Sequence, residues 1–133
     1  MQAIKGKISK PLPTNATLVA CDNSGAKILK IIAVKRAKTR WGRKPCAGVG
    51  DLVWVDVVKG APEIRKKVVN AVIVRQKKEY TRPNGMRIKF EDNAAIVLKD
   101  DLKTPKGTLF KGPIAKEACE RWPSIAKIAR III

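Results

Sequence analysis

Short apolar runs separated by turn-forming residues dominate the pattern along this chain. Residues 17–21, 26–34, 52–58, 68–74 and 94–98 are rich in Val, Ile, Leu and Ala, with Gly, Pro, Asn or Asp between most of them. Runs of this length predict strands. Strands at such short spacing favour a mainly β fold, either a small closed barrel or a sandwich.

Residues 86–90 alternate strictly, with apolar side chains at the even positions and Arg87 and Lys89 at the odd ones. Alternation of period two predicts a half-buried strand, here one whose exposed face is positive. Asn84 and Gly85 directly before it are a strong signal for a hairpin turn. We therefore expect a hairpin that presents cations.

The spacing becomes helical near the end of the chain. Ile114, Ala118 and Trp122 recur every four residues after Pro113, which can occupy the first position of a helix. Trp122 and its two partners are expected to pack on the barrel. The charged residues of this segment are expected to face away: Lys116, Glu117, Glu120 and Arg121.

The helical segment is expected over about residues 113–128. Pro123 should end the first helix, and a second short helix or strand should cover 124–133. The chain of 133 residues carries no internal repeat or linker. Its length suits one core, so residues 1–133 are expected to form a single domain.

Net charge is the unusual feature of the composition. Lys and Arg total 29 against 11 Asp and Glu, which gives a formal net charge of +18 and an isoelectric point near 10.3. Such an excess repels itself and is typical of proteins that bind a polyanion such as nucleic acid. Charge kept for solubility alone would interleave both signs and need a smaller excess.

Residue types needed for metal binding and catalysis are scarce. The chain has no histidine, and Cys21, Cys46 and Cys119 form no CxxC pair, so we expect three reduced thiols and no metal or cofactor. The glycine-containing segment 47–51 lacks the residues of a phosphate-binding loop. Adjacent carboxylates such as 100–101 are more often surface or turn residues than a catalytic pair. We therefore expect no enzyme.

No apolar run approaches the roughly 20 residues of a membrane span or resembles a signal peptide. The expectation is a soluble intracellular protein.

Two clusters of cations are the candidate binding elements. No acidic residue lies between Asp22 and Asp51. Lys and Arg in that interval can neutralise phosphates, and a Trp among them can either stack on an unpaired base or tuck back onto the barrel. The candidates in this first cluster are Lys35, Arg36, Lys38, Arg40, Trp41, Arg43 and Lys44.

The second cluster flanks the expected hairpin turn. A hairpin with cations on both strands would form a rigid positive ridge that suits the phosphates lining an RNA groove. The alternative is an edge hairpin that its charges merely keep soluble. The candidates are Arg75, Lys77, Lys78, Arg82, Arg87 and Lys89. A third group, residues 63–67, is weaker because Glu63 partly compensates it.

Three segments resemble the universal large-subunit ribosomal protein family conventionally numbered fourteen. They are residues 22–26, 47–51 and the block 71–97, which holds an Ala followed by aliphatics, a basic stretch, an Asn-Gly turn, Phe90, Asn93 and further aliphatics. Residues 62–67 and 112–119 are similar to the archaeal and eukaryotic branch, and the short N-terminal region favours the archaeal side.

This resemblance implies more than the composition does. It implies a small closed five-stranded barrel with short C-terminal helices, bound to large-subunit rRNA beside neighbouring ribosomal proteins in the cytoplasmic ribosome. It also implies a place at the subunit interface, an intersubunit bridge to small-subunit rRNA, and docking of a subunit anti-association factor near the C-terminal helix. The candidate face for a protein partner is Lys116, Glu120 and Arg121.

Two rival functions are weighed against this one. A free barrel that binds single-stranded nucleic acid needs several aromatic side chains on one sheet face as stacking platforms. Only six aromatic residues occur here, and only Tyr80 and Phe90 lie near a basic strand. An RNA-modifying enzyme would need a catalytic set that the sequence lacks.

Overall fold

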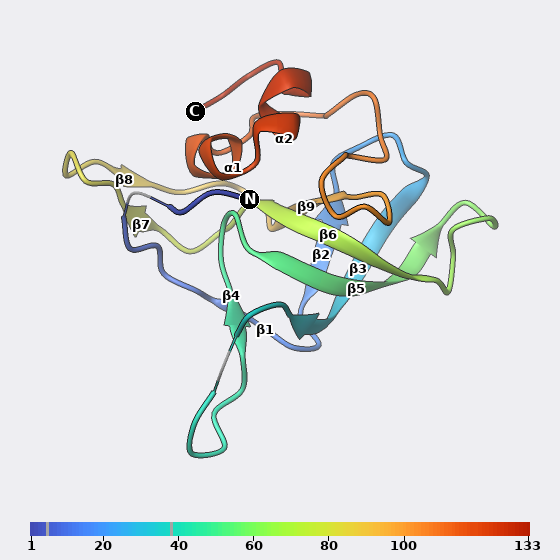
Figure 1. The fold of residues 1–133 in the computed structure, drawn as a ribbon, viewed down its shortest axis with the longest axis horizontal. Coiled ribbons are helices and arrows are strands. Elements are labelled where there is room, and N and C mark those ends of the chain that lie inside the picture. Colours follow the sequence, from blue (N-terminus) through green and yellow to red (C-terminus); the bar gives the residue numbers. More distant parts are fainter. Residues whose placement is uncertain (5, 38) are drawn as a thin grey trace.

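A closed barrel of five strands forms the centre of the computed structural model, which describes residues 1–4, 6–37 and 39–133 (Figure 1). Neighbouring strands pair antiparallel, except that the first and last pair in parallel to close the barrel. The expected mainly β fold with a small closed five-stranded barrel is confirmed. The barrel strands are β2 (Thr17–Ala20), β3 (Ala26–Val34), β5 (Leu52–Gly60), β6 (Val68–Arg75) and β9 (Ala94–Val97).

The interior of the barrel is filled by branched aliphatic side chains. Leu29 and Ile31 from β3 and Val53 and Val55 from β5 are completely buried there. Successive side chains of a strand point to opposite faces, so these positions alternate with exposed ones along β3 and much of β5. Removal of this apolar surface from water is the main stabilisation of the barrel.

Strand β9 and residues 71–75 of β6 are buried on both faces. Ile73 points into the barrel, whereas Val72, Val74 and Ile96 belong to a second apolar core outside it. Two short helices, α1 (Lys116–Arg121) and α2 (Pro123–Ile128), cover that outer side (Figure 1). This second layer explains why the sequence of both strands reads as continuous apolar runs.

The helical segment begins later than its spacing predicts. Residues 113–115 are extended, and the Ala115 N–H donates to the Val74 carbonyl at 3.2 Å, so α1 starts only at Lys116. Pro123 follows the end of the first helix at Arg121, as predicted. It lies in the first turn of α2, where a missing N–H costs nothing. Ile114, Ala118 and Trp122 are buried against the barrel, as their spacing predicts.

Two segments project beyond the barrel. The β3–β4 loop (residues 35–45) leads from β3 to β4 (Cys46–Ala47), which pairs with β1 (Leu12–Pro13). The β7–β8 hairpin (residues 76–90) contains β7 (Tyr80–Thr81) and β8 (Arg87–Ile88). Figure 1 shows the loop and the hairpin extending from the barrel in different directions. We call these two segments the arms.

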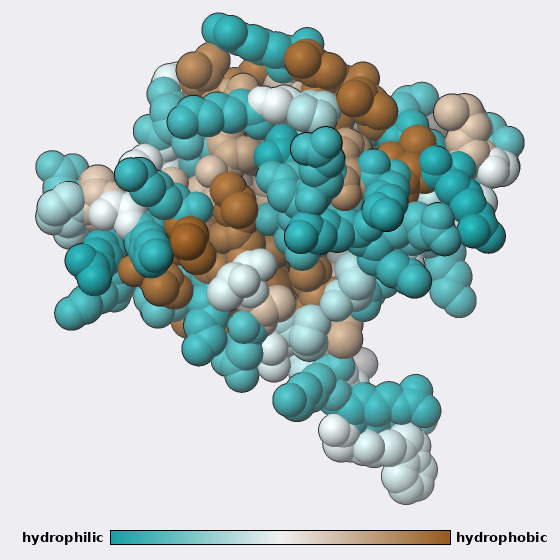
Figure 2. Space-filling view, turned by 180° about the vertical axis from the view of Figure 1, so that it is seen from behind, coloured by the Kyte–Doolittle hydropathy of each residue, from teal (hydrophilic) through white to brown (hydrophobic). Residues whose placement is uncertain are grey.

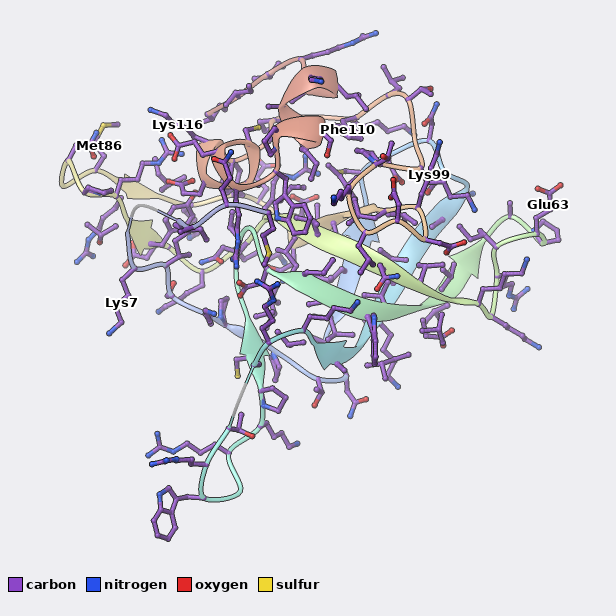
Figure 3. The ribbon with its side chains drawn as sticks, viewed as in Figure 1. Lys7, Glu63, Met86, Lys99, Phe110 and Lys116 are labelled. Carbon is purple, nitrogen blue, oxygen red and sulfur yellow. The ribbon has the colours of Figure 1, made fainter. Side chains whose placement is uncertain are left out.

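The hairpin turn lies where the sequence predicts it. Gly85 has a φ of +86°, and the Asn84 side-chain oxygen accepts the Met86 N–H at 3.0 Å. The strict alternation of residues 86–90 is only partly realised. Phe90 is buried, but Met86 is 57% exposed at the outer end of the hairpin (Figure 3), because the paired part of β8 is only two residues long.

Candidate nucleic-acid interface

Among the residues that the structure describes, four cations of the β3–β4 loop have no carboxylate partner. Arg36, Arg40, Arg43 and Lys44 are exposed, and in the part of the chain that the structure describes none of them has an ion-pair partner. Seen from behind, the loop stands apart from the body of the protein with a hydrophilic or nearly neutral surface (Figure 2). This loop can therefore reach a polyanion without the barrel approaching it closely.

Two members of the first cluster differ from this description. Lys35 is half-buried, and its Nζ lies 5.0 Å from the centroid of the Trp54 ring. This cation–π contact directs the Lys35 side chain back to the barrel. Lys38 lies outside the described residues.

Trp41 is 91% exposed at the end of the loop and does not tuck back onto the barrel. It occupies a tight turn in which the Arg43 N–H donates to the Arg40 carbonyl at 3.3 Å. Trp41 and Gly42 have φ values of 60° and 66°, and positive values at both central positions are the mark of a type I′ turn.

The β7–β8 hairpin forms the second positive arm. Lys77, Lys78, Arg87 and Lys89 are all exposed. Arg87 pairs with the exposed Glu79 at 3.1 Å, a surface contact that costs little to exchange for a phosphate.

Arg75 does not belong to the exposed ridge that the sequence predicts. Its side chain is buried and its Nε and Nη2 donate to the two Asp92 oxygens at 2.8 and 3.0 Å. Its Nη1 donates to the carbonyls of Lys111 and Pro113 at 2.9 Å each. A guanidinium committed to four such bonds holds the chain before α1 against β6 and is not free to bind RNA.

Arg82 is likewise held inside the protein. Its Nε donates to Glu117 at 2.6 Å and its Nη2 donates to the Ile133 carbonyl at 2.5 Å. The other Glu117 oxygen accepts the Tyr80 hydroxyl at 2.8 Å. Burial and this carboxylate raise the pKa of Tyr80 well above its usual range, so the hydroxyl stays a donor. Glu117 was expected to face solvent, but it is buried because it ties the hairpin to α1.

The candidate partner face is smaller than the sequence predicts. Arg121 turns inward, and its Nη1 donates to Asp51 at 3.0 Å. Asp51 also pairs with Lys10 at 3.3 Å and accepts the Gly48 N–H at 2.9 Å. Lys116 remains exposed on α1 (Figure 3), as does Glu120, and their charged atoms lie 4.0 Å apart.

The first two motifs that carry the family resemblance, residues 22–26 and 47–51, lie where hydrogen bonds join separate segments of the chain. The buried Asp22 accepts the Val97 N–H at 3.0 Å and the Ser24 hydroxyl at 2.8 Å, and its burial raises its pKa. The Asn23 side chain accepts the Thr108 N–H at 2.8 Å. The pattern of charges along the sequence could not reveal that Asp22 and Asn23 join separate segments. The only signal in the sequence is the family motif to which both residues belong.

Three properties of the described residues bear on other functions. They include no group of three or more His, Cys, Asp or Glu side chains placed to hold a metal ion. No helix within the described ranges is long and apolar enough to cross a membrane. Cys21, Cys46 and Cys119 are free thiols, and burial raises the pKa of Cys21 to about 12 and that of Cys119 to about 11.

The geometry defines a small, strongly basic β-barrel protein with two cationic arms. The family described as ribosomal protein L14p/L23e matches residues 11–133, and the chain belongs to this family. Proteins named large ribosomal subunit protein uL14 are 55% identical in Nanoarchaeum equitans and 50% identical in Methanothrix thermoacetophila, each over the full length of both chains. The one from Methanococcus vannielii is 52% identical over 99% of both chains. The resemblance drawn from the motifs is confirmed.

The two hairpin arginines should respond differently to truncation. Arg82→Ala leaves Glu117 buried without its cation and should lower the free energy of unfolding by about 3 kcal/mol. Arg87→Ala removes an exposed pair and should cost less than about 1 kcal/mol. Chemical denaturation of both variants measures the difference. Equal losses would contradict the assignment of Arg82 to the interior.

Proposed function

We propose that this chain is a structural, non-catalytic constituent of the large ribosomal subunit that acts as one domain in the cytoplasmic ribosome. It binds large-subunit rRNA through its two arms and packs beside neighbouring large-subunit proteins. The single observation that carries this proposal is the set of exposed cations on the β3–β4 loop, which have no ion-pair partner among the described residues, in a chain of this family.

Most of the affinity comes from phosphates. Each Lys or Arg that neutralises a phosphate releases condensed counterions, which favours binding at low salt. The rigid arms select RNA by its shape and by the position of its phosphates, not by base sequence. The contacting cations are Arg36, Arg40, Arg43 and Lys44 on the loop and Lys77, Lys78, Arg87 and Lys89 on the hairpin.

The rival function as a free single-strand binder is disfavoured by the placement of the aromatic residues. Tyr80 is 3% exposed and Phe90 is 7% exposed, so the two rings near the basic hairpin lie in the core. Only Trp41 presents a largely exposed ring among the described residues. One ring does not make the row of stacking platforms that such modules use.

We also propose that the chain lies at the subunit interface, where it contributes to a bridge with small-subunit rRNA. An anti-association factor docks on the exposed charges of α1. Lys116 and Glu120 are the side chains free to make such a contact, because Arg121 is paired with Asp51. Charge complementarity at an interface of this kind mainly sets which partner binds.

Removing the loop cations tests the rRNA contact. Arg40, Arg43 and Lys44 replaced together by Ala should leave thermal stability unchanged, because these side chains touch no core. The slope of log affinity against log salt for deproteinised large-subunit rRNA should fall by about 0.7–0.9 for each phosphate that is no longer neutralised. The matched control replaces Arg65, Lys66 and Lys67, which are exposed in the loop between β5 and β6. An equal change in both triple variants would show that rRNA does not favour the loop.

Exchanging the two exposed charges of α1 tests the partner face. Lys116→Glu combined with Glu120→Lys keeps the net charge and the four-residue pair, so folding and rRNA binding should stay at the wild-type level. Capture of the anti-association factor by assembled large subunits should weaken. The reversal Lys127→Glu on the neighbouring helix serves as control. Wild-type capture by the exchanged variant would assign this face to solvent alone.

A further inference from the structure

The indole ring of Trp41 lies in water while every other described aromatic side chain is at least half covered. Trp54 is 45% exposed, and Trp122, Phe90 and Phe110 are each below a tenth. A bulky ring in water forgoes the gain that burial would bring, and Trp is enriched at interfaces, so the ring is available for contact with a partner.

The local backbone holds the ring outward. A turn with positive φ at both central positions is best served by Asn-Gly, and a bulky residue at φ 60° is uncommon. A side chain built at Gly42 would meet nothing within 4 Å, which shows how open the surroundings of this turn are. Trp41 therefore occupies a position where Asn would suit the turn better and where its ring is hardly covered by the described residues.

The charges around Trp41 identify what covers it. Arg40 and Arg43 flank the turn and Lys44 follows, all exposed, and no acidic residue occurs between Asp22 and Asp51. A partner must therefore combine negative charge with a flat surface that an indole can cover. A nucleotide does so, since each unpaired base has a π face and is flanked by phosphates.

We propose that Trp41 stacks on an unpaired base of large-subunit rRNA while Arg40 and Arg43 contact the phosphates on either side of it. This inference rests on the proposed rRNA binding and adds a stacking contact that phosphate neutralisation alone does not require. It places a single-stranded or bulged nucleotide of the rRNA at the end of the β3–β4 loop.

Two substitutions separate the ring from the turn. Trp41→Phe keeps an aromatic face, whereas Trp41→Asn supplies the residue that the turn prefers and removes the ring. Binding of the full chain to deproteinised large-subunit rRNA should weaken roughly 5- to 150-fold for Trp41→Asn, the equivalent of one missing stack. Trp41→Phe should stay closer to wild type. Neither variant should change the salt slope, because every phosphate keeps its cation.

Fluorescence gives an independent readout. The Trp41 emission is the difference between the spectra of wild type and Trp41→Phe. In the free protein, acrylamide should quench it. In the complex, the stacked base should lower the emission and shield the ring from acrylamide. Trp54→Phe is the control variant and should bind as wild type does.

Equal rRNA affinity of wild type and Trp41→Asn would overturn the stacking contact. If the affinity still fell steeply with salt, the proposed function would stand. Loss of subunit incorporation without loss of binding to free rRNA would also overturn the stacking contact, because the ring would then dock on a protein. Absence of salt-dependent rRNA binding by wild type would instead refute the proposed function.

Discussion

Four buried or half-buried carboxylates join separate elements of this protein. Asp22 joins the β2–β3 turn to β9 by accepting the Val97 N–H. Asp92 accepts two hydrogen bonds from Arg75, whose guanidinium also binds the chain that leads to α1. Asp51 grips Arg121 of α1, and Glu117 ties α1 to the β7–β8 hairpin. Only 11 acidic residues accompany 29 basic ones, so carboxylates used inside the fold cannot also neutralise the surface. Removing one partner of a largely buried pair is costly, and these joints therefore fix where the arms are presented.

The use of carboxylates inside the fold also explains why the surface is so positive. With several carboxylates occupied at joints, the cations of the β3–β4 loop remain without partners among the described residues and repel one another. A polyanion relieves that repulsion and gains counterion entropy at the same time. The hairpin combines both roles: Arg82, next to the turn, is held by Glu117, whereas Arg87 and Lys89 on the returning strand remain exposed. Stability and the proposed rRNA binding thus draw on different members of one basic cluster.

Apolar runs were sufficient to locate the five segments that form the barrel strands, and a four-residue spacing located the buried stripe of Trp122. The Asn84-Gly85 turn followed from its residue types, and the closure of five strands into a barrel followed only from the family resemblance. Sequence patterns failed where two similar side chains have different environments. Arg75 and Arg87 look equivalent in a basic run, yet only the first has Asp92 and two carbonyls within reach in the folded chain. Glu117 and Arg121 occupy the polar face of a short helix, but hairpin and loop segments remote in sequence cover that face. Sequence spacing cannot reveal partners supplied by distant segments.

The proposed binding mode requires that rRNA meets the two arms and not the barrel wall. Ultraviolet cross-linking of the wild-type chain to deproteinised large-subunit rRNA, followed by peptide mapping, distinguishes the two surfaces. Cross-linked nucleotides are expected on peptides that contain Trp41 and on peptides from residues 77–89, with few on the outer barrel face around Val19 and Val68. Cross-links concentrated on that barrel face or on α2, with both arms unmodified, would rule this binding mode out.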